Sequence, residues 1–494
     1  MQSEDIKPSI PNNEPIIENK ALNIYEALLP VLILVGMLAY NIFIFGDTAL
    51  GGTNQFILLL GAAVAAIVGF RNKVTYSQML EEVAHNVKST SSAILILLMV
   101  GSLTGSWLIS GIIPSMIYYG LQILSPSIFL AASLVICSIV SLATGSSWST
   151  SATVGIALIG IGQSMGVSPG MTAGAVISGA YFGDKISPLS DTTNLASAMA
   201  GSKLFDHINY MMLTTIPTIL IALLIFLVLG FNISTTGAPD ITDKLTAIDA
   251  AFNISPWLFL VPLAVILMIV KKTEPLIALL LGSLLGGAAA IIAQPEIVIK
   301  IAGGSILDFN TAYKGVMTAL TTKTEVQTTN ADLNQLFTAK GMEGMLSTIW
   351  LILCAMVFGG VMDAIGALAR ISKALLNLFH TTFGLFASTV LSCLAINVTA
   401  SDQYLAIVIP GKMYAQAFKA KGLHPVNLSR TLEDTGTVTS ALIPWNTCGA
   451  YQASVLGVTT GEYFIYAIFN WLSPFTTLLF AGLGLKIKKI TSDK

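Results

Sequence analysis

A polar stretch, Gly183-Asp184-Lys185-Ile186-Ser187-Pro188-Leu189-Ser190-Asp191-Thr192-Thr193-Asn194, interrupts a chain that is otherwise strongly apolar. It holds two carboxylates, one lysine, four hydroxyl groups and one amide, with a proline among them. Such groups are costly in a membrane and persist there mainly where they line a site. A helix that proline interrupts at membrane depth also leaves backbone groups free to bind ions. We interpret this stretch as the ion-coupling site of a secondary transporter.

The composition predicts an all-α polytopic membrane protein. Of the 494 residues, 54% are hydrophobic and only 10% are charged, whereas roughly 25% of the residues of a soluble domain are charged. Apolar runs of about 20 residues, the length of a membrane-spanning helix, recur from end to end. The predicted spans are 24–46, 53–70, 91–112, 127–144, 207–230, 254–270, 273–293, 347–364, 383–400 and 461–486. We expect membrane lipid around the chain, and the net charge of −2 argues against a nucleic-acid partner.

No pattern of residues indicates an enzyme or a cofactor. The cysteines and histidines have neither metal-ligand nor disulfide spacing; they are Cys137, Cys354, Cys393, Cys448, His85, His207, His380 and His424. A phosphate-binding loop of the Gly-x-x-x-x-Gly-Lys-Ser/Thr type is also missing from the sequence. We therefore expect transport without bound cofactor and without ATP hydrolysis on this chain.

The two halves of the sequence carry similar segments in the same order, which predicts an internal duplication. The matching pairs are Asn54–Phe70 with Glu274–Ile291, Ile94–Leu108 with Ile349–Asp363, and Asp184–Asn194 with Asp434–Asn446. Each half also contains two polar breaks, at 144–151 and 184–194 in the first and at 399–403 and 434–447 in the second. Interrupted segments in corresponding positions indicate the binding site of a transporter.

The distribution of basic residues predicts that the two halves are inverted relative to each other. Arg71, Lys73 and Lys88 place the loop after the second span in the cytoplasm, whereas the corresponding loop shows no basic excess and is expected outside. The basic C-terminus is also expected inside. The expected organisation is a disordered cytoplasmic tail (1–23), repeat 1 (24–230), an external linker (231–253), repeat 2 (254–486, with an external loop at 295–345) and a cytoplasmic tail (487–494). Both termini of this multi-pass cell-membrane protein would then be cytoplasmic.

The polar breaks are rich in the oxygen ligands that a hard cation such as Na⁺ requires. Hydroxyl and amide groups provide these oxygens without adding many buried charges. A single membrane serine or threonine usually bonds its own helix, but their density at breaks in both halves indicates a site. The candidate Na⁺ ligands are Thr144, Ser146, Ser147, Thr150, Ser187, Ser190, Thr192, Thr193, Asn194, Thr399, Asn446 and Thr447.

Exchange of Na⁺ for H⁺ needs a group that holds one or the other, and a desolvated carboxylate can do this. Asp191 is the first candidate because it lies at the centre of the first break, just after Pro188. Asp184 is the second, although it could instead pair with the adjacent Lys185. The remaining candidates are Asp402, Asp434 and Asp363, the last because it lies alone in an apolar span.

The segment Gly183–Ala196, preceded by Thr144-Gly145-Ser146-Ser147-Trp148, resembles the NhaC family of sodium/proton antiporters. Length and span pattern fit over nearly the whole chain. The resemblance implies inverted repeats, re-entrant hairpins in a mobile transport domain, a scaffold domain, elevator-type movement and a homodimer. The transported ions would be Na⁺ and H⁺.

Two other functions stay open at this point. The same family contains members that exchange malate for lactate, and Lys185 and Lys412 are the basic residues nearest to the breaks that could hold a carboxylate substrate. A passive Na⁺ channel would use the same oxygens without a titrating carboxylate. We prefer Na⁺/H⁺ exchange, with organic-acid exchange as the alternative.

Overall fold

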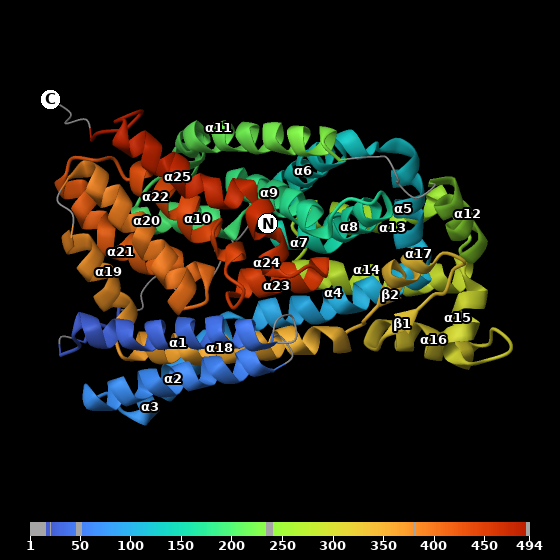
Figure 1. Cartoon of the computed structure of the whole chain (residues 1–494), viewed down its shortest axis with the longest axis horizontal. Coiled ribbons are helices and arrows are strands. Elements are labelled where there is room, and N and C mark those ends of the chain that lie inside the picture. The colour runs from blue at the N-terminus through green and yellow to red at the C-terminus, as the bar shows by residue number, and fades with distance from the viewer. Residues whose placement is uncertain (1–15, 20, 46–51, 234–240, 379–380, 491–494) are drawn as a thin grey trace, which may run out of the picture.

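The computed structural model describes residues 16–19, 21–45, 52–233, 241–378 and 381–490, and these are mostly helical (Figure 1). Within these described ranges, eight helices are long and apolar enough to cross a membrane. They are α1 (Ile24–Phe45), α2 (Thr53–Arg71), α4 (Ser91–Ile109), α6 (Pro126–Thr144), α11 (Leu204–Phe231), α14 (Pro275–Ala293), α18 (Leu346–Ala364) and α20 (Thr382–Thr399). Each agrees with a predicted span to within three residues at either end. The prediction of a polytopic helical protein is confirmed.

Two further spans are bent. Helix α12 (Ile241–Ala251) meets the helical stretch Pro256–Val270 at 83°, and Thr460–Tyr466 meets α25 (Ile468–Gly482) at 51°. The span predicted at 461–486 corresponds to the second pair and is bent, because the backbone of Ala467 leaves the helical region, at φ −75° and ψ 60°. The segment expected as a linker, 231–253, contains α12.

Shorter elements fill the rest of the described chain. The α-helices are α3 (Tyr76–Ser89), α5 (Ile112–Ile123), α7 (Ser147–Thr150), α8 (Ile156–Ser164), α9 (Pro169–Ile186), α10 (Asp191–Ala200), α13 (Leu260–Val270), α15 (Pro295–Ala302), α16 (Phe309–Thr321), α17 (Ala331–Leu336), α19 (Ala367–Leu378), α21 (Gln403–Ala420), α22 (Val426–Leu432), α23 (Thr447–Leu456) and α24 (Thr460–Tyr463). Two π-helices, η2 (Ser151–Gly155) and η5 (Glu433–Thr437), and four 3₁₀ turns, η3 (Pro256–Phe259), η4 (Glu343–Met345), η6 (Ser440–Leu442) and η7 (Phe464–Tyr466), complete the helices. Strands β1 (Thr324–Glu325) and β2 (Thr338–Ala339) pair antiparallel within 295–345.

Helix boundaries recur between the halves of the chain. Helices α6 and α20 begin 256 residues apart, at Pro126 and Thr382, and so do α10 and α23, at Asp191 and Thr447. Helices α10 and α23 also end alike, because each is followed by a glycine in the left-handed region, Gly201 or Gly457. The order of helices and caps is thus similar in the two halves.

Helices α6 and α9 approach each other closely because α9 has glycines on the shared face. A Cβ on Gly179 would lie 2.3 Å from the carbonyl oxygen of Leu134, and one on Gly183 would lie 2.4 Å from that of Ser138. Small residues allow membrane helices to pack backbone against backbone in this way. This packing places the C-terminal end of α9, with Asp184 and Lys185, in the protein interior.

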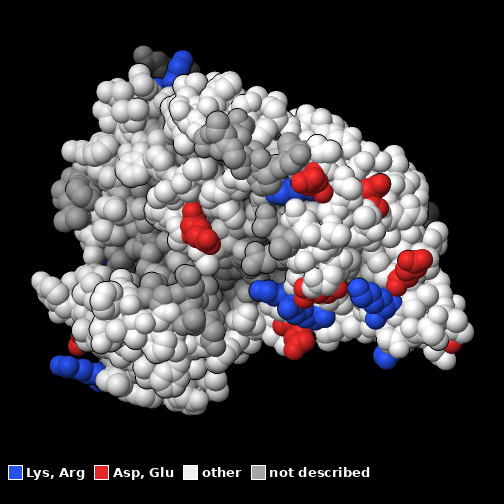
Figure 2. Space-filling model, turned by 45° about the vertical axis from the view of Figure 1, so that its right-hand side comes forward, with Lys and Arg blue, Asp and Glu red and all other residues white. Residues whose placement is uncertain are grey.

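The surface is mostly apolar between its charged ends. Large hydrophobic side chains such as Phe43, Phe231 and Ile292 are more than two-thirds exposed, as is expected of a surface that faces lipid. Figure 2 shows lysine, arginine, aspartate and glutamate side chains gathered towards the end of the molecule that carries α12, α15 and α16. The rest of that face is largely uncharged.

Candidate ion-coupling site

The first break of each half is a sharp turn made by one residue in the left-handed region. In the first half this residue is Gly145 (φ 68°), which ends α6, and Ser146 then caps α7. In the second half it is Ser401 (φ 61°), and Asp402 caps α21 by accepting hydrogen bonds from the backbone of Tyr404 (2.8 Å) and Leu405 (3.0 Å). Left-handed backbone is costly for a serine, so the fold enforces the turn at Ser401.

The second break of each half lies against the first. Asp184 accepts hydrogen bonds from the backbone N–H (3.0 Å) and hydroxyl (2.7 Å) of Ser147, which tie the end of α9 to the start of α7. In the second half, the N–H of Thr447 donates to the carbonyl oxygen of Ser401 (2.9 Å). Ser190 and Asn446 cap the helices that follow these breaks. Four helix termini therefore meet in one region.

A cavity of about 510 Å³ lies where these termini meet. Ten of the predicted site residues line it: Asp184, Asp191, Asp402, Thr144, Ser146, Ser147, Ser190, Thr192, Asn194 and Thr447. They come from both halves of the chain. Asp191 is exposed to the cavity, whereas Asp184 and Asp402 are buried in its wall. The structure thus brings three of the five candidate carboxylates together with seven of the candidate ligands.

The other candidates lie outside this lining. The hydroxyl groups of four of them donate to backbone carbonyls: Thr150 to Ser146, Ser187 to Leu142, Thr193 to Lys185 and Thr399 to Ala395. Asn446 donates to the backbone and side-chain oxygens of Asn397 (3.1 and 3.2 Å). Asp363 lies near the C-terminal end of α18 and does not line the cavity. Asp434 belongs to a second, buried cluster.

Asp434 forms an ion pair with Lys185 inside the protein, and neither side chain is exposed. Asp434 also accepts hydrogen bonds from Thr214 of α11 (2.9 Å) and from Thr477 of α25, while Lys185 donates to Ser473 (3.1 Å). The alternative reading of Asp184, a pairing with the adjacent Lys185, does not hold, because Lys185 pairs with Asp434. Adjacent residues of a helix point in different directions, so Asp184 faces Ser147 and Lys185 faces Asp434.

Glu433 connects the buried cluster to the cavity and was not among the predicted site residues. Its side chain is fully buried, and its Oε1 accepts a hydrogen bond from the hydroxyl of Thr192 (3.0 Å), which lines the cavity. Glu433 begins the π-helix η5, an element that is frequent at functional sites. The signal was present in the sequence, since an acidic residue in an apolar segment is a functional candidate by default.

A model of the Na⁺/H⁺ antiporter family matches residues 179–485, which include the cavity residues Asp184, Asp191 and Asp402. The chain belongs to the Na⁺/H⁺ antiporter family. The resemblance drawn from Gly183–Ala196 is thereby confirmed.

Three relatives in the Na⁺/H⁺ antiporter family show the extent of the similarity. The Na⁺/H⁺ antiporter NhaC of Alkalihalophilus pseudofirmus is 36% identical over 432 residues, covering 87% of this chain and 90% of the relative. The protein of the same name from Bacillus subtilis is 35% identical over 399 residues, covering 80% and 85%. The malate-2H⁺/Na⁺-lactate antiporter of Bacillus subtilis is 34% identical over 439 residues and covers 88% of each chain.

In this member of the Na⁺/H⁺ antiporter family, Asn397 at the end of α20 binds several residues of the break at 434–447. Its side-chain amide donates to the carbonyl oxygen of Gly436 (2.8 Å) and to the hydroxyl of Thr439 (3.0 Å). The backbone and side-chain oxygens of Asn397 accept hydrogen bonds from the side-chain amide of Asn446. A single buried asparagine thus joins the apolar helix α20 to the break at 434–447, and its polarity within that span was the available signal.

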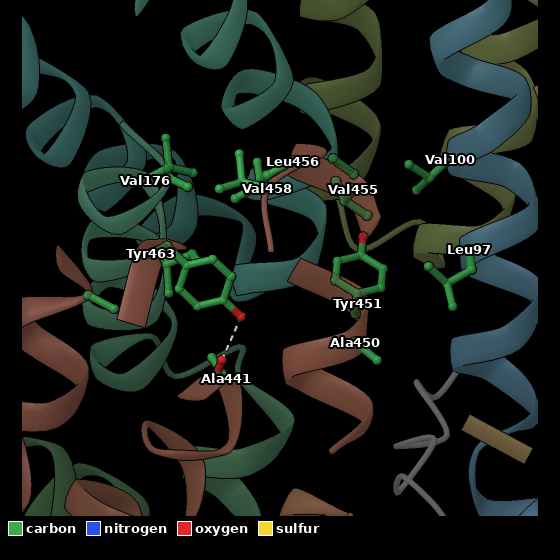
Figure 3. Packing of buried hydrophobic residues seen from close by; sticks show 14 of the residues in the cluster. Leu97, Val100, Val176, Ala441, Ala450, Tyr451, Val455, Leu456, Val458 and Tyr463 are labelled. Carbon is green, nitrogen blue, oxygen red and sulfur yellow. Dashed lines mark hydrogen bonds between the residues drawn. The ribbon is translucent and has the colours of Figure 1, made fainter. Parts of the chain in front are cut away.

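The cavity lining includes polar residues of two connecting segments, Ser89, Thr90 and the turn Lys272–Glu274, and we call this part of the lining the polar end. Trp148, which also lines the cavity, stacks on Tyr451, with ring centroids 4.0 Å apart. The hydroxyl of Tyr451 donates to the carbonyl oxygen of Trp148 (3.0 Å). Figure 3 shows Tyr451 and Val455 beside Leu97 and Val100, in an apolar cluster that also holds Tyr463, whose hydroxyl donates to Ala441 (2.7 Å).

Proposed function

We propose that this chain exchanges Na⁺ for H⁺ across the cell membrane at the cavity between the four helix termini. The observation that carries the proposal is that Asp184, Asp191 and Asp402, from distant parts of the chain, line one cavity beside many hydroxyl groups. Carboxylate and hydroxyl oxygens suit a hard cation. The names of the NhaC relatives support Na⁺ and H⁺ as the transported ions.

The chemistry of exchange follows from competition at these carboxylates. A carboxylate that coordinates Na⁺ is deprotonated, and a protonated carboxyl group loses most of its attraction for the ion. Loading one ion therefore releases the other. We assign this competition to Asp191 and Asp184, with Asp402 as a further oxygen ligand and Asp434 as the charge that neutralises Lys185.

We further propose that repeats 24–230 and 254–486 have opposite orientations in the membrane, with both termini in the cytoplasm. The recurrence of helix starts and caps about 256 residues apart supports the repeats. The basic residues at Arg71, Lys271 and Lys272 support the orientation. In this orientation the polar end of the cavity, at Lys272–Glu274, opens to the cytoplasm.

Elevator-type movement and a homodimer complete the proposal. Helices α1–α4, α14 and α18 would form the scaffold, and α6–α11 with α20–α25 would carry the cavity across the membrane (Figure 1). Several helix contacts fall within these two groups, such as α2 with α18 and α6 with α9. The proposed dimer rests on the family resemblance.

The test is proton flux in everted membrane vesicles loaded acid inside. Addition of NaCl alone should make the lumen more alkaline, because Na⁺ entering the vesicle would drive protons out. Asp191→Asn should abolish this response while the protein still inserts into the membrane. Na⁺ entry without proton movement would identify a channel and overturn the proposal.

Organic-acid exchange is the second candidate, favoured by one feature of the cavity. Lys272 lines it and could attract a carboxylate, although Glu274 lies beside it. Of the two lysines that the sequence suggested, Lys185 pairs with Asp434 and Lys412 does not line the cavity. In the same vesicles, a proton response that requires malate or lactate would favour this alternative.

A further inference from the structure

We propose that this protein binds an anionic phospholipid in a second pocket, at the end of the molecule that carries the C-terminal segment. The phosphate group of the lipid would lie against lysine side chains at the rim, and an acyl chain would lie along the apolar wall. Among the described residues, this pocket shares no lining residue with the ion cavity. The inference therefore does not depend on which ions the protein exchanges.

The first argument is the combination of an apolar wall with a basic rim. The pocket has a volume of about 430 Å³. Its wall includes Ala200 at the end of α10, Phe418 near the end of α21 and Leu428 of α22. The lining also contains Lys419 and His424. Such a pocket fits an amphiphile that has a negatively charged head group and a hydrocarbon chain.

The second argument is that the C-terminal segment brings further lysines to this rim. Leu423 pairs with Lys489 in an antiparallel bridge, and the N–H of His424 donates to the carbonyl oxygen of Lys488 (3.0 Å). Side chains of directly opposed residues lie on the same face of an antiparallel pair. Lys489 is therefore placed beside Leu423, which lines the pocket together with Ile490.

The third argument is the excess of positive charge. Six exposed lysines lie in the segments that form or flank the pocket: Lys203, Lys419, Lys421, Lys486, Lys488 and Lys489. Within the described chain, Lys419, Lys488 and Lys489 form no ion pair. The charged groups that act on His424 are Lys488 and the carboxylate of Asp206. A phosphate group would supply the negative charge that this rim lacks.

The position of the pocket favours a membrane lipid over a free phosphate compound. Figure 1 shows α21 and α22 at the same end of the molecule as α3 and the C-terminus, opposite to α15 and α16. Leu483, Leu485 and Ile490 are more than 40% exposed beside the lysines of the C-terminal segment. Exposed apolar and basic side chains occur together at the membrane surface, where lysines reach the head groups. In the proposed orientation this surface is the cytoplasmic leaflet, whose anionic lipids attract basic segments.

The pocket lies between elements that other contacts already hold together. The hydroxyl of Ser202, just after α10, donates to that of Ser429 in α22 (3.1 Å). The side-chain amide of Asn427 donates to the carbonyl oxygen of Lys488 (2.6 Å). A lipid that contacts the same elements binds the folded protein and not the unfolded chain. Its binding should therefore raise the midpoint of thermal unfolding.

The experiment measures the binding of radioactive phosphatidylglycerol to the whole chain, purified in detergent and immobilised on beads. Unlabelled phosphatidylglycerol should displace the label, whereas phosphatidylcholine should not. Each lysine near a membrane surface strengthens attraction to anionic lipid about fivefold, so Lys419→Gln/Lys489→Gln should weaken binding about 30-fold. The matched control is Lys300→Gln/Lys314→Gln, which removes two exposed lysines at the opposite end and should bind as the wild type does.

A second variant and a second competitor test the place of the acyl chain. Ala415 lines the pocket, so Ala415→Trp fills it without a change of charge and should also weaken binding. Inorganic phosphate should not displace the label, because it has no chain to occupy the apolar wall. Phosphatidylglycerol should raise the midpoint of thermal unfolding of the wild type more than that of the lysine variant.

Several results would overturn the inference. These are an unchanged affinity in Lys419→Gln/Lys489→Gln or in a folded Ala415→Trp, and equal displacement by phosphatidylcholine or by inorganic phosphate. The lysine variant alters exposed side chains alone, so it decides the question if Ala415→Trp fails to accumulate. Binding is measured without ion flux, so a failure of the proposed Na⁺/H⁺ exchange would leave these results unchanged.

Discussion

Lys185 and Asp434 are 249 residues apart in the sequence and form an ion pair with no exposed surface. The pair joins the end of α9 to η5, and hydrogen bonds from Thr214 and Thr477 extend it to α11 and α25. Four elements from both halves thus meet at one carboxylate. The cavity lies next to this junction, because Asp184 and Glu433 are the chain neighbours of the paired residues.

Removal of one partner of the Lys185–Asp434 ion pair should destabilise the protein strongly. Lys185→Met leaves Asp434 as an unpaired charge in the interior, and breaking a buried ion pair in this way costs about 3–5 kcal/mol. We expect a lower midpoint of thermal unfolding in detergent, measured by intrinsic fluorescence. The double variant Lys185→Met/Asp434→Asn should regain part of the loss, since no charge remains unpaired. Additive losses in the double variant would contradict the pairing.

Replacement of a cavity carboxylate should weaken Na⁺ binding without unfolding the protein. Interactions with a charged group contribute about 1.5–3 kcal/mol, so Asp184→Asn should raise the Na⁺ concentration for half-maximal exchange by about 10- to 100-fold. The titration is made with proteoliposomes at fixed pH. Asp363→Asn is the matched control, because Asp363 does not line the cavity; an equal effect of both variants would show that the cavity is not the site.

The polar end of the cavity should be accessible from the cytoplasm. The four native cysteines are buried, so single added cysteines can be followed with a membrane-impermeant maleimide. We expect Thr273→Cys to react in inside-out vesicles and not in right-side-out vesicles. Val455→Cys, in the buried apolar cluster, should react in neither. Reaction of Thr273→Cys only from the outside would reverse the proposed orientation.

The contact between α6 and α9 should not tolerate a methyl group. In Gly179→Ala the new Cβ meets the backbone of Leu134, and overpacking of this kind costs typically about 1–3 kcal/mol. Gly36→Ala is the control, since a Cβ on Gly36 has no atom within 4 Å. Thermal unfolding of the two variants in the same detergent measures the difference. Equal stability of both would show that the two helices do not pack on this face.

The long helices could be predicted from the sequence because apolar runs of spanning length are their direct cause. The bend at Ala467 could not, since neither proline nor glycine marks that position. Short helices such as α10 and α23 could not be predicted from the sequence either. The sequence shows their caps, Ser190 and Asn446, as polar residues, but their role as helix starts depends on neighbouring chain segments.

The residues that form the candidate site could largely be predicted from the sequence, but which side chains bind each other could not. The density of oxygen atoms at the breaks singled out Asp184, Asp191 and Asp402, which share the cavity. Nothing local in the sequence assigns Lys185 to Asp434 or separates the roles of Glu433 and Asp434. The direction of these two side chains depends on the π-helix η5, whose wider turn changes which residue faces which neighbour.

The burial of Lys185 has a consequence for how the protein is made. Lys185 leaves the ribosome 249 residues ahead of Asp434. At a synthesis rate of about 5–20 residues per second, the lysine waits roughly 12–50 s for its partner. An unpaired ammonium group is costly in lipid throughout that time. We therefore expect helix α9 to reach its final depth in the membrane only after the second half of the chain has been synthesised.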